Sequence, residues 1–351
     1  VIFGLVFASM IVNLLSSVFS VATFATEHMH WRSGWDIVQN SIRALVLIGL
    51  YYFLSPAVYY LGIAAIVVAI LNAAVQFCFS KKLLPSYNLD FSLFDRRYVF
   101  ELLKSGVWNS VNNLGSILTM NVSILVANLL LGASVSGDLS IVQTLPNFAA
   151  SIISAVYGVL LARLARIYAR GDMYETVNYV KDSQKILGII CSVPIVIAMA
   201  LGKYFFELWV PNQDAVYLQV LSIITMLPVL VHSSMWTVFG LNVINNNLRT
   251  PALVLISVGA LSVVTMVVLI DTTSLGVYSI TASSSICNCL FYFAFLPVYA
   301  SKKMNIPTST FFSHMIKTLV YALMVVILAW LARDLLDNLI CSWVSFFVVW
   351  I

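Results

Sequence analysis

The sequence predicts an all-α protein, a polytopic membrane bundle of about eleven transmembrane helices. Of its 351 residues, 61% are hydrophobic and only 9% are charged, whereas a soluble domain carries about 25% charged residues. The apolar residues also fall in runs close to the roughly 20 residues that a helix needs to cross a bilayer. So few charges cannot cover a soluble fold of this length, and the lipid bilayer is therefore the expected solvent for most of the chain.

The predicted spans follow one another along the whole chain, separated by polar loops. They are residues 1–25, 37–54, 57–79, 106–131, 137–162, 186–206, 215–242, 251–270, 275–299, 314–332 and 339–351. Val1 and Ile351 both lie inside apolar runs, and no Met begins the sequence. We therefore expect helices to be missing before Val1 and the last helix to be truncated.

The loops predict the orientation of the spans, because Lys and Arg accumulate in cytoplasmic loops. When alternate loops are assigned to one side, starting after the first span, that side receives every Lys and Arg except Lys203 and Arg333. One missed helix would destroy this bias. The first span is therefore predicted to run from outside to inside, and the long basic segments 81–105 and 163–185 to be cytoplasmic.

Polar residues share one face of each span in the hairpin 106–162, because residues three and four apart lie on the same side of a helix. Tight packing is one interpretation, since small and hydroxyl residues let membrane helices approach closely. The other is a water-filled cavity between two halves of the protein, because polar groups facing lipid are costly. For this hairpin the number of Asn and Gln residues favours the cavity. The candidate cavity residues are Asn109, Asn112, Asn113, Ser116, Gln143 and Asn147.

Similar stripes occur in three other spans, where packing and a cavity both remain open. Ser9, Asn13, Ser16, Ser17 and Ser20 form the one in span 1–25. The stripe in span 275–299 contains Thr281, Ser284, Ser285, Asn288 and Tyr292, and that in span 215–242 contains Ser222, Thr225, His232, Ser233 and Trp236.

Two ionisable residues inside the spans complete the candidate substrate cavity. Arg43 lies about two turns into its helix, on the face of Asp36, Gln39 and Asn40. It either snorkels to the cytoplasmic surface or contacts an anion at the inner mouth of the cavity. His232 lies near the middle of its span and is either functional, as intramembrane ionisable residues often are, or hydrogen-bonded to a neighbouring carbonyl.

No motif for covalent chemistry is present. The sequence contains no Walker A loop, no HExxH and no paired carboxylates within a span. The cysteines have no metal-ligand spacing with histidines, and no basic and aromatic interleaving suggests nucleic acid. We therefore expect no enzymatic activity, catalytic residue, metal, cofactor or nucleic-acid partner.

Several segments, taken in order, resemble the Wzx-type polysaccharide flippases, within the superfamily that includes the MATE exporters and the lipid II flippases. Leu103–Gly115 looks like the start of that family's seventh helix, and Leu139–Leu145 like the start of its eighth. Tyr168–Glu175 is similar to its Ala-x-Gly-Asp segment. Residues 130–133 look like the family's short outer turn, and residues 242–251, 275–278 and 297–303 also fit it. The chain departs from the family at Asn121, where an Asp is common, and at Ala162-Arg163, where a Pro is common.

The resemblance implies a two-lobed alternating-access transporter, of which the chain covers helices four to fourteen out of fourteen. Residues 1–104 would be the remainder of the N-terminal bundle with a cytoplasmic linker, 105–300 the C-terminal six-helix bundle, and 301–351 two additional helices.

The implied substrate is an undecaprenyl-pyrophosphate-linked oligosaccharide, flipped from the inner to the outer leaflet for O-antigen, capsule or exopolysaccharide synthesis. The implied location is a bacterial or archaeal cytoplasmic membrane, and the implied coupling ion is H⁺ or Na⁺. A MATE-like small-molecule exporter and a polytopic glycan polymerase or ligase remain as alternatives.

Overall fold

The computed structural model describes residues 2–26, 28–55, 57–85 and 95–331, and these residues form helices joined by short loops, with no strand among them. The chain divides into two compact units, Val1–Asp95 and Arg96–Ile351. Among the described residues, eight helices are long and apolar enough to cross a membrane, and a bent pair raises the number to nine. The predicted helical membrane bundle is confirmed. The predicted span 339–351 lies outside the described residues.

The first unit consists of α1 (Ile2–Ala25), α2 (Met29–Phe53) and α3 (Tyr60–Leu83). Helices α1 and α3 pack along their length. Gly62 permits this close approach, because a Cβ atom there would lie 2.8 Å from Cβ of Leu5. Helix α2 corresponds to the predicted span 37–54 but begins eight residues earlier, and it is not among the eight apolar helices.

The second unit begins with α4 (Arg96–Met120), α5 (Val122–Leu130), α6 (Ala133–Val142) and α7 (Thr144–Ala169), followed by α8 (Met173–Trp209), α9 (Ala215–Ile244) and α10 (Arg249–Thr272). It ends with α11 (Val277–Cys289), a π-helical turn (Leu290–Phe295), α12 (Leu296–Lys303) and α13 (Ser309–Leu331). Helix α9 is central, since it contacts α6, α7, α8, α11, α12 and α13.

Two helix starts in this unit follow local capping chemistry. The Asp172 carboxylate accepts a hydrogen bond from the backbone N–H of Glu175 at 2.9 Å, and the Asp214 carboxylate accepts bonds from the N–H groups of Val216 and Tyr217 at 3.0 and 3.1 Å. An Asp in this position pairs N–H groups that have no partner within the helix. These two caps fix where α8 and α9 begin. Much of the unit packs against these two helices.

Two of the predicted straight spans are interrupted. Span 106–131 is broken at Asn121 into α4 and α5, whose axes differ by 43°. Span 275–299 passes through the π-helical turn Leu290–Phe295. Such turns often mark functional or specially packed positions in helices.

Candidate functional site

The polar face of α6 and α7 is exposed along most of its length. Ser140, Thr144, Asn147, Ser151 and Ser154 are all exposed, and Gln143 is half-buried. The hydroxyls of Ser140 and Ser151 donate to carbonyl oxygens of their own helix at 2.8 and 2.9 Å. These hydroxyl bonds stay within α6 and α7, which is not the pattern expected of side chains that hold neighbouring helices together.

The polar face of α4 divides into an exposed and a buried part. Asn109 and Asn113 are exposed and Ser116 is half-buried, whereas Asn112 is only 7% exposed. The buried Oδ1 atom of Asn112 has no hydrogen-bond partner among the described residues. The neighbouring residues Asn112 and Asn113, both predicted to line the cavity, therefore have different surroundings.

Three polar residues of α11 are used for helix packing. Ser284 Oγ and Asn288 Nδ2 both donate to the carbonyl oxygen of Thr119 on α4, the latter at 3.1 Å. Ser285 Oγ donates to the carbonyl oxygen of Ile224 on α9 at 2.7 Å. For this stripe, packing accounts for the polar side chains.

His232 belongs to an aromatic cluster between α9 and the π-helical turn. Its ring stacks on that of Tyr292 with centroids 3.8 Å apart, and the ring of Trp236 lies edge-on at 5.0 Å. Tyr157 of α7 extends the cluster through Trp236 at 5.1 Å. A flat ring stacked in this way is held by its neighbours, and the described contacts of His232 are aromatic.

Arg43 lies on an exposed polar face of α2. Arg32, Asp36, Asn40 and Arg43 are all exposed, and their spacing of three and four residues places them on one side of the helix. Arg43 belongs to the first unit, and all the other predicted cavity residues belong to the second. Within the second unit, Asn109 and Asn113 lie on α4, Gln143 and Asn147 lie at and beyond the junction of α6 and α7, and His232 lies in its aromatic cluster on α9.

One polar connection in the first unit was not predicted. Trp35 Nε1 on α2 donates to Asn72 Oδ1 on α3 at 3.0 Å, and Asn72 Nδ2 donates to Asn13 Oδ1 on α1 at 3.1 Å. Asn72 thereby links all three helices. The sequence signal was weak, because Asn72 and Gln76 are the only two amide residues in the otherwise apolar span 57–79.

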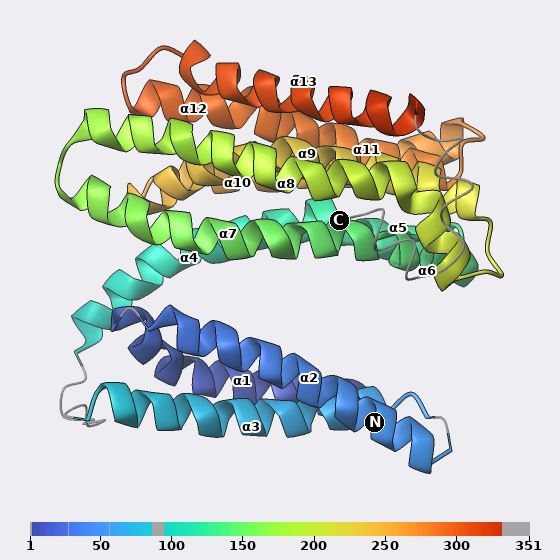
Figure 1. The fold of residues 1–351 in the computed structure, drawn as a ribbon, viewed down its shortest axis with the longest axis horizontal. Coiled ribbons are helices and arrows are strands. Elements are labelled where there is room, and N and C mark those ends of the chain that lie inside the picture. The colour runs from blue at the N-terminus through green and yellow to red at the C-terminus, as the bar shows by residue number, and fades with distance from the viewer. Residues whose placement is uncertain (1, 27, 56, 86–94, 332–351) are drawn as a thin grey trace. The chain divides into compact units, whose positions relative to one another are not determined.

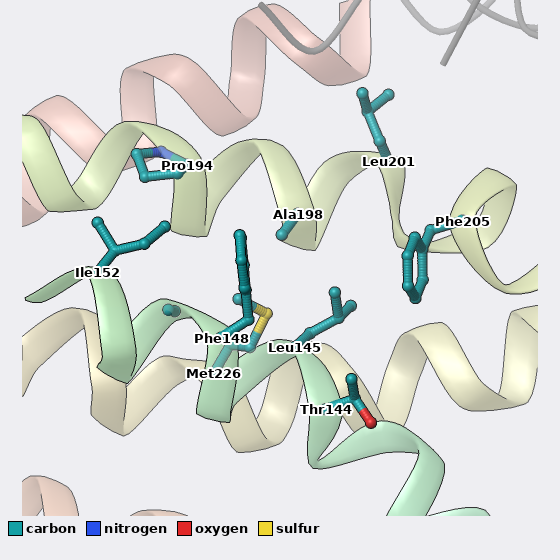
Figure 2. A pocket seen from close by; sticks show the side chains of 10 residues that line it. Thr144, Leu145, Phe148, Ile152, Pro194, Ala198, Leu201, Phe205 and Met226 are labelled. Carbon is teal, nitrogen blue, oxygen red and sulfur yellow. The ribbon is translucent and has the colours of Figure 1, made fainter. Parts of the chain in front are cut away.

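A cavity of about 280 Å³ lies between α7, α8 and α9 and is almost wholly apolar. Figure 2 shows Phe148, Ile152, Pro194 and Met226 around it, with Thr144 at one end. Thr144 belongs to the exposed face of α6–α7, but none of the predicted Asn and Gln residues lines this cavity. It is suited to an apolar group rather than to a sugar.

The described residues contain no cluster of three or more His, Cys, Asp or Glu side chains that could hold a metal ion. In the second unit the candidate residues offer amides and hydroxyls, and in the first unit Arg43 offers a cation. Amides both donate and accept hydrogen bonds, so they suit a neutral, hydroxyl-rich ligand.

Known proteins provide two likenesses. No protein-family model matches the chain. In sequence, the chain is 28% identical over 297 residues to the uncharacterized membrane protein EpsK of Bacillus subtilis (strain 168), covering 83% of this chain and 58% of that protein. The chain thus spans little more than half the length of this relative.

In structure, the chain resembles the lipid II flippase MurJ in its inward closed conformation. The TM-score is 0.52 at 15% sequence identity, over 93% of this chain and 74% of that one. The chain has the MurJ fold. This likeness concerns the fold, and it agrees with the helical membrane bundle described above.

Proposed function

We propose that the chain forms the larger part of a flippase for a lipid-linked oligosaccharide. The substrate would be an undecaprenyl-pyrophosphate-linked repeat unit, moved from the inner to the outer leaflet of a bacterial or archaeal cytoplasmic membrane during polysaccharide biosynthesis. The exposed polar faces of α4 and α6–α7 carry this proposal. Polar groups are expensive in hydrocarbon, so these faces are best explained by contact with water or a polar substrate.

Each part of the substrate would meet different chemistry. The amides of Asn109, Asn113, Gln143 and Asn147 would bind sugar hydroxyls, and the guanidinium of Arg43 would bind the diphosphate, to which its fork of N–H donors is matched. The polyprenyl chain would remain in the bilayer. Alternating access, with H⁺ or Na⁺ as the coupling ion, is the expected mechanism for transporters with sites in discontinuous helices.

The side chains of the polar faces favour this function over the alternatives. A small-molecule exporter for cationic drugs would favour acidic groups, whereas the faces of α4 and α6–α7 present amides and hydroxyls. A glycan polymerase or ligase would need a large outer loop bearing Arg or His, and the outer turns such as 132–136 and 271–274 are short. The likeness to the MurJ fold also supports a transporter.

The test is a flipping assay with the full-length protein in proteoliposomes, using fluorescent lipid-linked oligosaccharide and a membrane-impermeant quencher. We expect protein-dependent exposure of the lipid in the opposite leaflet. A variant with Asn113 and Asn147 replaced by Leu should lose this activity, whereas a variant with the buried packing residue Ser234 replaced by Ala should keep it. Absence of flipping by the wild-type protein would refute the proposal.

A further inference from the structure

A second cavity of about 280 Å³ lies between α8 and α13, apart from the polar faces described above. Lys185 and Ile189 of α8 form one wall, and His314, Lys317, Thr318 and Tyr321 of α13 form the other. The spacings i, i+4 on α8 and i, i+3, i+4, i+7 on α13 each place the lining residues on one helix face. The distribution of Lys and Arg puts this end of both helices at the cytoplasmic side.

The mouth of this pocket is cationic. Lys185 and Lys317 line it, and no carboxylate does. Lys181 and Asp182 also lie near enough to act electrostatically on His314. Asp182 contacts Lys185 at 2.9 Å, but both side chains are more than half exposed, and such surface pairs are weak. Three lysines against one aspartate leave the mouth positive.

One buried polar atom in the pocket lacks a partner. His314 Nδ1 is buried and has no hydrogen-bond partner among the described residues. The neighbouring hydroxyl of Thr318 is already used, because it donates to the carbonyl oxygen of His314 at 3.1 Å. This nitrogen has almost no accessible surface and so does not open into the pocket, and the two lysines are the groups that would hold a ligand.

The deeper part of the pocket is apolar and aromatic. Tyr321 lies seven residues beyond His314, or about 10 Å further along the helix axis, and Ile189 lies one turn beyond Lys185. The ammonium groups of Lys185 and Lys317 therefore stand at the membrane surface, with hydrocarbon walls below them. A soluble anion would use only the mouth, whereas a lipid would use both parts.

The two helices are held together directly beside this pocket. Gly188 of α8 faces Thr318 of α13, and a Cβ atom at Gly188 would overlap the Thr318 side chain. The spacing of the two walls is therefore set by close packing rather than by the flexible lysines, so the pocket is a built feature of the fold.

We propose that this pocket binds the phosphate group of an anionic lipid of the inner leaflet. Lys185 and Lys317 would contact the phosphate oxygens, as basic pockets between membrane helices do. The hydrocarbon chain would lie along Ile189 and Tyr321. This site is independent of the proposed flipping activity.

The test is native mass spectrometry of the full-length protein, titrated separately with phosphatidylglycerol, a polyprenyl monophosphate and zwitterionic phosphatidylcholine. The variant Lys185→Gln/Lys317→Gln is compared with Lys302→Gln/Lys303→Gln. Both remove two positive charges at the same predicted side of the membrane, but Lys302 and Lys303 lie at the end of α12, outside the pocket. Melting temperatures in lipid-free detergent show whether each variant is folded.

We expect the pocket variant to bind phosphatidylglycerol about tenfold more weakly, since charge-assisted contacts are the strong ones, and the control variant to bind like wild type. If the pocket variant instead loses binding of the polyprenyl monophosphate alone, the anionic lipid in the pocket is the polyprenyl phosphate. Equal losses in the pocket and control variants, no loss in either, or equal binding of phosphatidylcholine would overturn the proposal.

Discussion

The hydroxyl of Ser285 donates a 2.7 Å hydrogen bond to the carbonyl oxygen of Ile224, four residues before Pro228 in α9. Pro228 has no backbone N–H, so the helix itself cannot pair this carbonyl in the usual way. Ser285 comes from α11 and replaces the missing donor. A polar residue inside a membrane span thus compensates for a proline in a neighbouring span.

This relationship predicts that the cost of Ser285→Ala depends on Pro228. In the wild-type background the substitution leaves a carbonyl without its donor and should destabilise the fold by about 1 kcal/mol, within the range seen for hydrogen bonds between membrane helices. In a Pro228→Ala background the helix supplies the N–H, and the same substitution should cost much less. Reversible unfolding of all four proteins in mixed detergent measures the coupling, and additive losses would contradict this account.

The contact between α4 and α10 predicts a second stability effect. Gly259 of α10 faces Leu118 of α4 so closely that an added Cβ atom would lie 2.7 Å from the Leu118 Cβ. Gly259→Ala should therefore destabilise the protein by about 1–3 kcal/mol through overpacking. Gly158→Ala is the matched control, because a Cβ atom there would meet nothing within 4 Å. It should be neutral or slightly stabilising, since Ala favours a helix. Similar melting temperatures for the two variants would show that the helices can move apart.

Burial predicts a pattern of cysteine labelling along α4 and α7. In a cysteine-free background, Cys at position 109, 113 or 147 should react with a membrane-impermeant maleimide, because these positions are exposed and lie on polar faces. Asn112→Cys should not react, because Asn112 is buried. Val264→Cys on α10 should also be unreactive, because its 58% exposed side chain lies among apolar neighbours and faces lipid. If positions 112 and 113 were labelled equally, water would not be confined to one face of α4.

The proposed role of Arg43 predicts a charge-dependent loss of transport. Arg43→Ala should reduce flipping of a diphosphate-linked lipid by about tenfold, as expected for one charge-assisted contact. Arg43→Lys should retain part of the activity, because the charge remains but the bidentate geometry is lost. Arg32→Ala, on the same exposed face but in the first turn of α2, serves as the control. If both alanine variants flip like wild type, the arginines only anchor α2 at the membrane surface.

The helical membrane bundle and the order of its apolar helices were predictable because run length and hydropathy are local properties, whereas the predicted number of eleven exceeds the eight or nine apolar spans among the described residues. The predicted segments 106–131 and 137–162 correspond to α4–α5 and α6–α7, and the predicted polar face of the second is exposed except at the half-buried Gln143. That face depends only on helical periodicity, which the sequence shows directly. The assignment of these residues to a substrate cavity stays a prediction.

The break at Asn121 could not be predicted, because its supporting contacts come from residues 284 and 288, far along the chain. The same is true of Asn72, whose partners Trp35 and Asn13 lie on two other helices. The lysine pocket also depends on α8 and α13 being neighbours. In each case the sequence shows the polar or charged residue but not the distant residue that it contacts.

The carbonyl oxygen of Thr119 accepts hydrogen bonds from both Ser284 and Asn288, one residue before α4 ends at its 43° bend. Straightening α4 and α5 would return this carbonyl to an ordinary helical partner and remove the acceptor that Ser284 and Asn288 share, leaving Asn288 only its 3.0 Å bond to the carbonyl oxygen of Ser284. The bend is thus a rigid joint fastened to α11 rather than a flexible hinge. During any conformational change, the bend between α4 and α5 should move together with α11 as one rigid body. Bending should be confined to the helix segments on either side.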